Sequence, residues 1–179
     1  MSNMPINRML KLKVRPTGPV NSDHFELVEE QMTDLQDGQI LVKVLYLSFD
    51  PTQRGWLNDV KSYIPPVQIG EVMRASSVGQ VIDSKDSNFS SGDLVQGTFG
   101  WQEYAAVNSS SGMIPIQKIP EGIPPTSALS IYGITGLTAF FGMEEIGQPK
   151  EGDTVLVSGA AGATGSVAGQ IARIKGASN

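Results

Sequence analysis

The residues best suited to chemistry form a run of small side chains near the end of the chain. Residues 155–166 read VLVSGAAGATGS, an apolar segment followed by a tight turn and the start of a helix. The small residues at positions 160, 162 and 165 have the spacing of the dinucleotide fingerprint, with alanine in the first place. Gly162 would let backbone approach a pyrophosphate, Gly165 would let the helix pack closely, and the amides at the helix N-terminus attract phosphate. The sequence therefore predicts a nucleotide-binding turn, and a turn that serves packing alone is the alternative.

Two observations narrow the kind of nucleotide-binding turn that residues 155–166 can form. The ATPase phosphate loop requires Gly-Lys followed by Ser or Thr, whereas Gly165 is followed directly by Ser166. The residue that separates NAD from NADP is expected about 20 residues beyond the glycines, at the end of a second strand. Counted from Gly162, that position would lie beyond Asn179, the last residue of the chain. We therefore expect the chain to hold only the first βα unit of a cofactor domain.

The elements before the glycine run are predicted to be mostly strands. Short apolar segments recur at roughly 8–12-residue spacing, each bounded by Gly, Pro, Ser or Asn, which favours a small antiparallel barrel or sandwich. The predicted strands are residues 10–14, 25–29, 40–49, 78–83, 93–98, 101–107 and 113–119. Helices are predicted from Thr126 through Ile131, over 137–146, and after the glycine run as far as Gly176, with a buried strand at 154–158. The fold class is therefore mixed α/β.

Composition excludes several classes of protein. The chain has 179 residues, a formal net charge of −5, one histidine and no cysteine. Without cysteine there is no disulfide framework, thiolate zinc site or cysteine nucleophile. The net negative charge gives no general attraction to nucleic acid or anionic lipid. Since no apolar run reaches the ~18 residues of a membrane helix, we expect a cytoplasmic protein with no membrane or nucleic-acid partner.

A series of motifs resembles one enzyme family. The motifs are YLSFDP at 46–51, RG at 54–55, SYIPP at 62–66, SGD at 91–93, GWQEY at 100–104, GLTA at 136–139 and IGQPKEG at 146–152. Together they resemble the medium-chain dehydrogenase/reductase superfamily, in its zinc-independent branch of alkenal and enone reductases, which includes prostaglandin and curcumin reductases. The resemblance covers nearly all of the chain but only the N-terminal portion of such an enzyme.

The resemblance implies a domain plan and an activity. Residues 1–125 would form a β-rich, GroES-like, partly open barrel that binds substrate. Residues 126–179 would form linking helices and the start of a Rossmann cofactor domain. The full-length protein would be a homodimer that uses NADPH to reduce the C=C bond of α,β-unsaturated aldehydes and ketones. A quinone reductase of the same superfamily and a catalytically inert fragment are the alternatives.

The resemblance also places residues in the site. Tyr63 would face substrate, where a phenol can stabilise the negative charge that develops on a carbonyl oxygen; an ordinary loop aromatic is the alternative. The cofactor-binding positions carried over are Pro51, Ile134, Thr138, Gly162, Ala163, Thr164 and Gly165. The family commonly has Met-Pro where this chain has Ile134-Thr135, and Val where it has Thr164. Trp56 and Trp101 are expected to pack, with an apolar substrate cleft as the alternative.

Zinc is not expected. The alcohol dehydrogenase branch holds catalytic zinc with cysteine and with the histidine of a Gly-His-Glu motif, whereas this chain has Gly70-Glu71 and no cysteine. The single histidine, His24, is expected to lie at a strand end in an ordinary structural role. Direct oxidation of an alcohol with a zinc Lewis acid is therefore disfavoured.

Overall fold

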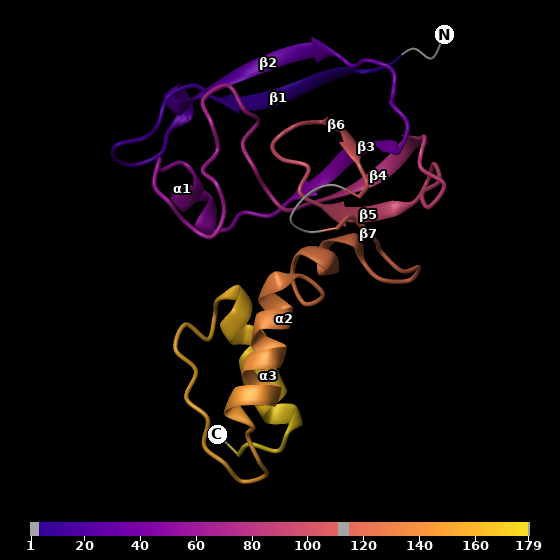
Figure 1. Ribbon diagram of the computed structural model, residues 1–179. Coiled ribbons are helices and arrows are strands. Elements are labelled where there is room, and N and C mark those ends of the chain that lie inside the picture. The colour runs from indigo at the N-terminus through magenta and orange to yellow at the C-terminus, as the bar shows by residue number, and fades with distance from the viewer. Residues whose placement is uncertain (1–3, 111–114, 179) are drawn as a thin grey trace. The chain divides into compact units, whose positions relative to one another are not determined.

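The chain divides into two compact units, which are described separately. The computed structural model describes residues 4–110 and 115–178 (Figure 1). The first unit is Met1–Gly122 and carries the strands, and the second is Ile123–Asn179 and carries the longer helices. The start of the strand predicted at 113–119 lies outside the described residues.

Antiparallel strands build the first unit. One sheet pairs β1 with β2, and the other has the order β6-β3-β4-β5-β7, with no closed barrel among the described residues. The strands are β1 (Ile6–Leu12), β2 (Phe25–Gln31), β3 (Gln39–Leu47), β4 (Ser77–Ser84), β5 (Leu94–Gly97), β6 (Tyr104–Asn108) and β7 (Gln117–Lys118). The free edge of β1 is joined to neighbouring loops, because Leu10 N donates to Trp101 O and Met73 N donates to Leu10 O, both at 2.9 Å. The two sheets are thus linked through β1.

Two apolar clusters form the core of this unit. One lies on the larger sheet around Ile40, Val42, Val81, Val95, Phe99 and Ala105. The other consists of Leu12, Leu57, Val67 and Met73, with Trp56 and Trp101 packed against it. The prediction that residues 40–49 are buried on both faces is only half right. Ile40, Leu41 and Val42 are buried, but Tyr46 is 47% exposed, because β3 leaves the core before it ends.

Helices dominate the second unit. Its elements are a 3₁₀ turn (Pro125–Leu129), α2 (Ile134–Phe141), a π-helical turn (Gly142–Gly147) and α3 (Ala163–Ile174), with α2 and α3 packed on each other. The helix predicted from Thr126 is only the short 3₁₀ turn, whose N-cap is Pro124. The C-terminus of α3 is as predicted. Gly176 has φ +92°, its amide donates to Arg173 O, and Ala177 N donates to Ala172 O, which is the Schellman arrangement.

The strand predicted at 154–158 is not formed as a strand. Residues 154–157 belong to no helix or strand and Ser158 begins a turn. Among the described residues this segment pairs with no strand, and α2, α3 and the turns around them make up the regular structure of this unit. A β-strand is stabilised by its neighbours, so an apolar segment without a partner cannot complete one.

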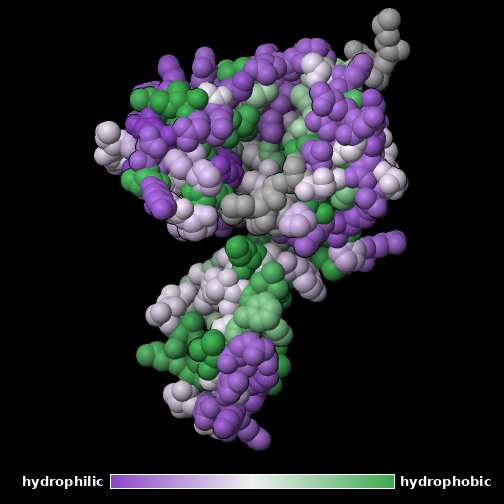
Figure 2. Space-filling model, in the orientation of Figure 1, coloured by the Kyte–Doolittle hydropathy of each residue, from purple (hydrophilic) through white to green (hydrophobic). Residues whose placement is uncertain are grey.

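The surface of the second unit is rich in apolar side chains. Its buried hydrophobic residues are Ala128, Ala139 and Ala172, whereas Leu156 is 97% and Ile174 83% exposed. Figure 2 shows hydrophobic residues, coloured green, across this part of the surface. Within the part of the chain that the structure describes, no helix is both long and apolar enough to cross a membrane.

Candidate functional site

Tyr63 lies in the loop after the short helix α1 (Thr52–Trp56), and its hydroxyl meets the side chains of that helix. Its Oη is 2.7 Å from Thr52 Oγ1 and accepts a hydrogen bond from Trp56 Nε1 at 3.3 Å. Thr52 and Trp56 are four residues apart, so they share one face of α1. The tyrosine is 73% exposed, and only its hydroxyl end is held. The structure therefore presents a fixed phenol at the surface of the first unit.

The surroundings of Tyr63 favour its ionised form. The hydrogen bond to Thr52 contributes most to lowering the pKa of the Tyr63 phenol, the hydrogen bond to Trp56 adds to it, and the positive charge of Arg74 adds a smaller effect. Partial desolvation opposes them. A phenol with a lowered pKa gives up its proton more readily, which suits a donor to a developing oxyanion.

Pro51 adjoins this group. It is the N-cap residue of α1 and directly precedes Thr52. The loop before it is anchored by Gln53, which is buried and whose Nε2 donates to Ser48 O at 2.6 Å. Ser48 Oγ also donates to Asp50 Oδ2 at 2.8 Å. The structure thus places two of the eight predicted site residues at α1: Pro51 is its N-cap, and Tyr63 hydrogen-bonds to its first residue, Thr52.

The glycine run forms a tight turn that opens α3. Gly159 has φ +64°, so the residue that needs a left-handed conformation lies one position before Ala160. The Gly159 carbonyl accepts from Gly162 N at 2.8 Å. A Cβ on Gly165 would lie 2.4 Å from that same oxygen. The missing side chain at Gly165 therefore leaves space for the Gly159 carbonyl of the turn. The sequence-based expectation was that it would let the helix pack closely on the strand.

The N-terminus of α3 has free amides. Gly162 is the N-cap, with extended backbone and no side-chain cap. The first bond inside the helix runs from Ser166 N to Gly162 O at 2.9 Å. The amides of Ala163, Thr164 and Gly165 precede that bond and have no carbonyl partner within the helix. Four predicted residues, 162 to 165, thus form one end of a helix whose amides and dipole suit an anionic group.

The remaining predicted positions lie on α2. Thr138 Oγ1 donates to Ile134 O at 2.7 Å, so these two residues occupy one face of the helix and both are exposed. Gly136 and Ala139, on another face, are buried. No hydrogen bond among the described residues joins this pair to the glycine turn.

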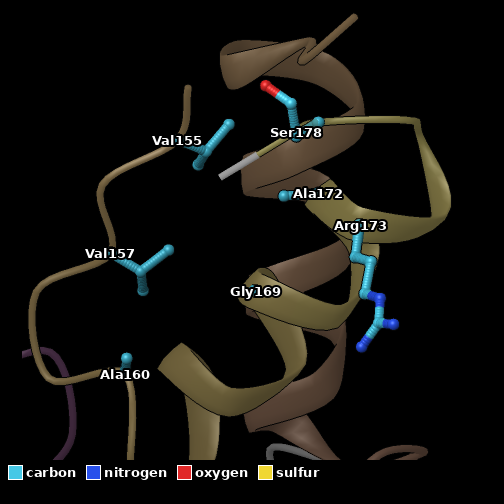
Figure 3. Close-up of a pocket in the computed structure, with 8 residues that line it drawn as sticks. Val155, Val157, Ala160, Gly169, Ala172, Arg173 and Ser178 are labelled. Atoms are coloured by element: carbon cyan, nitrogen blue, oxygen red, sulfur yellow. The ribbon is translucent and has the colours of Figure 1, made fainter. Parts of the chain in front are cut away.

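A hollow of about 500 Å³ lies beside α3, between the helix and the segment that leads into the glycine turn. Figure 3 shows Val155 and Val157 pointing across it toward the helix, with Gly169 and Ala172 on the other side and Arg173 turned away. None of the predicted site residues lines this hollow. It lies behind the turn and does not extend the row of free amides.

Comparison with known proteins identifies the family. A family model described as the N-terminal domain of oxidoreductase matches residues 8–129, well over half of the chain. The chain belongs to the medium-chain dehydrogenase/reductase superfamily. The predicted family resemblance is confirmed, down to the enone reductase branch.

Two relatives and one solved structure define the branch. The NADPH-dependent curcumin reductase of Escherichia coli is 39% identical over 170 residues, which is 95% of this chain and 48% of that protein. Prostaglandin reductase 1 of Bos taurus is 39% identical over 158 residues, 88% of this chain and 46% of that protein. The crystal structure of CurA in complex with NADPH from Vibrio vulnificus superposes with a TM-score of 0.84 and 39% identity, covering 95% of this chain and 50% of that one. The chain spans about half the length of the relatives it matches.

Sequence reasoning missed the partners of Tyr63. Trp56 was predicted to pack, and it does pack against the second core cluster, but its indole nitrogen also holds the phenol. Thr52 lies four residues before Trp56, and that spacing on a helix was the signal that could have found the pair. Arg74 is distant in sequence and carried no signal, since only the fold brings it to the Trp56 ring.

Proposed function

We propose that this chain supplies the substrate-binding part and the start of the cofactor domain of an NADPH-dependent reductase. Its substrates are α,β-unsaturated aldehydes and ketones, whose C=C bond is reduced without zinc. Residues 1–125 act as the GroES-like substrate domain, and residues 126–179 begin the Rossmann domain. The proposal is supported by the identity with an NADPH-dependent curcumin reductase over 95% of the chain, since curcumin is itself a conjugated enone.

The cofactor fits the residues that the second unit presents. The amides of Ala163, Thr164 and Gly165 would hold the pyrophosphate, because the N-terminus of α3 has no side-chain cap to compete for them. The lack of a side chain at Gly162 keeps the approach to these amides open. Pro51, Ile134 and Thr138 would line the nicotinamide side. When bound, NADPH supplies the hydride that adds to the β-carbon of the substrate.

The observation that carries the proposed chemistry is the fixed phenol of Tyr63. As the β-carbon is reduced, negative charge develops on the substrate's carbonyl oxygen, and a preorganised donor lowers the energy of that state. Tyr63 Oη is held at 2.7 Å from Thr52 Oγ1 and accepts from Trp56 Nε1, so its position is set before substrate arrives. Tyr63 therefore hydrogen-bonds to the carbonyl oxygen and supplies a proton to it.

The sequence favours this reaction over zinc-dependent alcohol oxidation. There is no cysteine, and the single histidine is His24. Its Nδ1 accepts a hydrogen bond from Asn21 N at 3.1 Å, which closes a capping box in a surface turn. Among the described residues no group of three His, Asp or Glu side chains could hold a metal ion. A phenol is thus the electrophilic group that the first unit offers.

A substrate comparison on the full-length protein tests the proposal. Steady-state oxidation of NADPH is measured with an α,β-unsaturated ketone, with the corresponding saturated ketone and with a quinone. The expected result is turnover of the unsaturated ketone and none of the saturated one, which lacks the C=C bond. Turnover confined to the quinone would show that the protein is the quinone reductase of the same superfamily and would refute the proposal.

A further inference from the structure

Trp56 is held on several sides, so the direction of its indole N–H is fixed. Its ring packs against the core cluster of Leu12, Leu57, Val67 and Met73. Its backbone carbonyl accepts from Val67 N at 2.9 Å, which ties the end of α1 to the next buried segment. The guanidinium carbon of Arg74 lies 5.4 Å from the ring centroid. The indole nitrogen, the polar end of this anchored side chain, donates to Tyr63 Oη.

Thr52 approaches the same oxygen from the other end of α1. Its Oγ1 is 2.7 Å from Tyr63 Oη, and either hydroxyl can be the donor. When Thr52 and Trp56 both donate, the Tyr63 oxygen accepts twice and its own proton is free for an acceptor outside the group. When the phenol has lost its proton, the same two donors bind the remaining oxygen.

Arg74 is the charged residue that acts on this group. Its Nη1 donates to Pro65 O at 2.9 Å, two residues after Tyr63, and its guanidinium lies over the Trp56 ring. In the part of the chain that the structure describes, Arg74 forms no ion pair with a carboxylate, so its charge is not neutralised by a neighbour. A positive charge near a phenol favours the phenolate.

We propose that Thr52, Trp56 and Arg74 are positioning residues for Tyr63, holding its hydroxyl as a proton donor and stabilising the phenolate it leaves. In the step, the Tyr63 O–H bond breaks, an O–H bond forms at the substrate's carbonyl oxygen, and the electron pair stays on the tyrosine oxygen. The enol so formed takes a proton from water at its α-carbon and returns its O–H proton to the Tyr63 oxygen, which leaves the saturated carbonyl compound and the neutral phenol. This role rests on the proposed function, but the hydrogen-bonded group can be tested without it.

Removing one hydrogen-bond donor at a time tests the group directly. Thr52→Val keeps the shape of the side chain without its hydroxyl, and Trp56→Phe keeps an aromatic ring without its N–H. Arg74→Gln removes the charge, and Arg74→Lys restores it. Trp101→Phe is the matched control, because Trp101 packs against the same cluster but its Nε1 is buried with no hydrogen-bond partner among the described residues.

The first readout is the titration of the Tyr63 phenol, followed by carbon NMR of tyrosine-labelled 179-residue chain without cofactor. Tyr63→Phe identifies the resonance among the four tyrosines. We expect a higher titration midpoint in Thr52→Val, Trp56→Phe and Arg74→Gln, a midpoint returned toward the original in Arg74→Lys, and no change in Trp101→Phe. An unchanged midpoint in both Thr52→Val and Trp56→Phe overturns the proposal, and so does an equal shift in Trp101→Phe.

The second readout is turnover of the full-length protein with an unsaturated ketone. Loss of one hydrogen bond is expected to lower kcat about two- to tenfold, with KM for the ketone unchanged, since the bond acts when charge develops. Lower kcat in Thr52→Val and Trp56→Phe, together with the raised midpoints, supports the positioning role. Raised midpoints in a protein that reduces no unsaturated ketone overturn the proposed function and leave the hydrogen-bonded group established.

Discussion

Replacing Gly165 by alanine adds one heavy atom, Cβ, and so tests how closely the glycine turn approaches α3. The added Cβ would lie 2.4 Å from the Gly159 carbonyl oxygen, 2.9 Å from its carbon and 3.0 Å from Ala160 Cα, all of them backbone atoms. An ordinary contact begins at 3.4 Å, so the turn must move by about 1.0 Å relative to α3. No flexible side chain is available to absorb that movement.

The expected cost follows from two opposing effects. Forcing an extra methyl group into a filled space costs about 1–3 kcal/mol. Replacing glycine by alanine inside a helix returns about 0.5–1 kcal/mol, because the unfolded chain loses freedom. The net destabilisation of the turn and of α3 is therefore about 0.5–2 kcal/mol, a factor of roughly 2–30 in the opening equilibrium.

Gly169→Ala is the matched control in the same helix. A Cβ at Gly169 meets nothing within 4 Å, since this residue faces the hollow beside α3. The same substitution should therefore be stabilising by about 0.5–1 kcal/mol. One helix thus offers two identical chemical changes with opposite expected signs.

Amide hydrogen exchange in α3 measures both variants, because it reports local opening of the second unit without requiring the whole chain to unfold together. Exchange of the α3 amides should quicken about 2–30-fold in Gly165→Ala. It should slow about two- to fivefold in Gly169→Ala. If Gly165→Ala exchanges as slowly as the unchanged chain, the close approach of turn and helix described above is wrong.

Four further outcomes follow from the structure. In the full-length protein, Tyr63→Phe should lower kcat about 10²-fold while leaving NADPH affinity unchanged, and unaltered kinetics would remove Tyr63 from the site. The 179-residue chain alone should bind NADPH poorly, because a single turn leaves the adenine and ribose without contacts, so micromolar affinity by calorimetry would contradict it. Gly136→Ala should disrupt α2, since its Cβ would lie 1.9 Å from Ile131 O; circular dichroism should show lost helix. The pKa of Asp93 is held below its ordinary 3.8 chiefly by Lys118 and also by the Ser90 amide. The ionised Asp93 carboxylate therefore stabilises the folded state above pH 3.8, and this contribution is lost as the pH falls through the lowered pKa of Asp93. The drop in the thermal unfolding midpoint below about pH 4 should be smaller in Asp93→Asn, which has no carboxylate to protonate.

The sequence predicted well those elements whose signal is local. Alternating or continuous apolar residues identified the strands of the first unit. The i, i+4, i+7 spacing of Val167, Ile171 and Ile174, with Gly176 beyond them, identified α3 and its end, although Ile174 is 83% exposed and does not pack as that stripe predicts. Such signals depend on residues a few positions apart, so they can be read without knowing the tertiary contacts. The motif at 155–166 was found for the same reason.

Features that depend on distant residues were not predictable. Arg74 lies over the Trp56 ring because the chain returns to the core cluster at Val67 and Met73, directly before Arg74. The left-handed conformation of Gly159 was not predicted, because the fingerprint gives spacing and not backbone angles. The exposure of Tyr46 in the second half of β3 depends on which elements cover the sheet, and β propensity does not report that.

The segment at 154–158 has the local pattern of a strand but, within the described part of the chain, lacks the distant contacts that a strand requires. Val155 and Val157 point toward α3 across the hollow, while Leu156 between them is 97% exposed, so the alternation expected of a strand is present (Figure 3). Among the residues that the structure describes, the segment has no hydrogen bonds to a second strand, and no local sequence pattern can supply them. The side chains of this segment are therefore arranged as in a strand that α3 covers on one face. The glycine turn forms without such pairing, because the hydrogen bond from Gly162 N to Gly159 O that closes it is local.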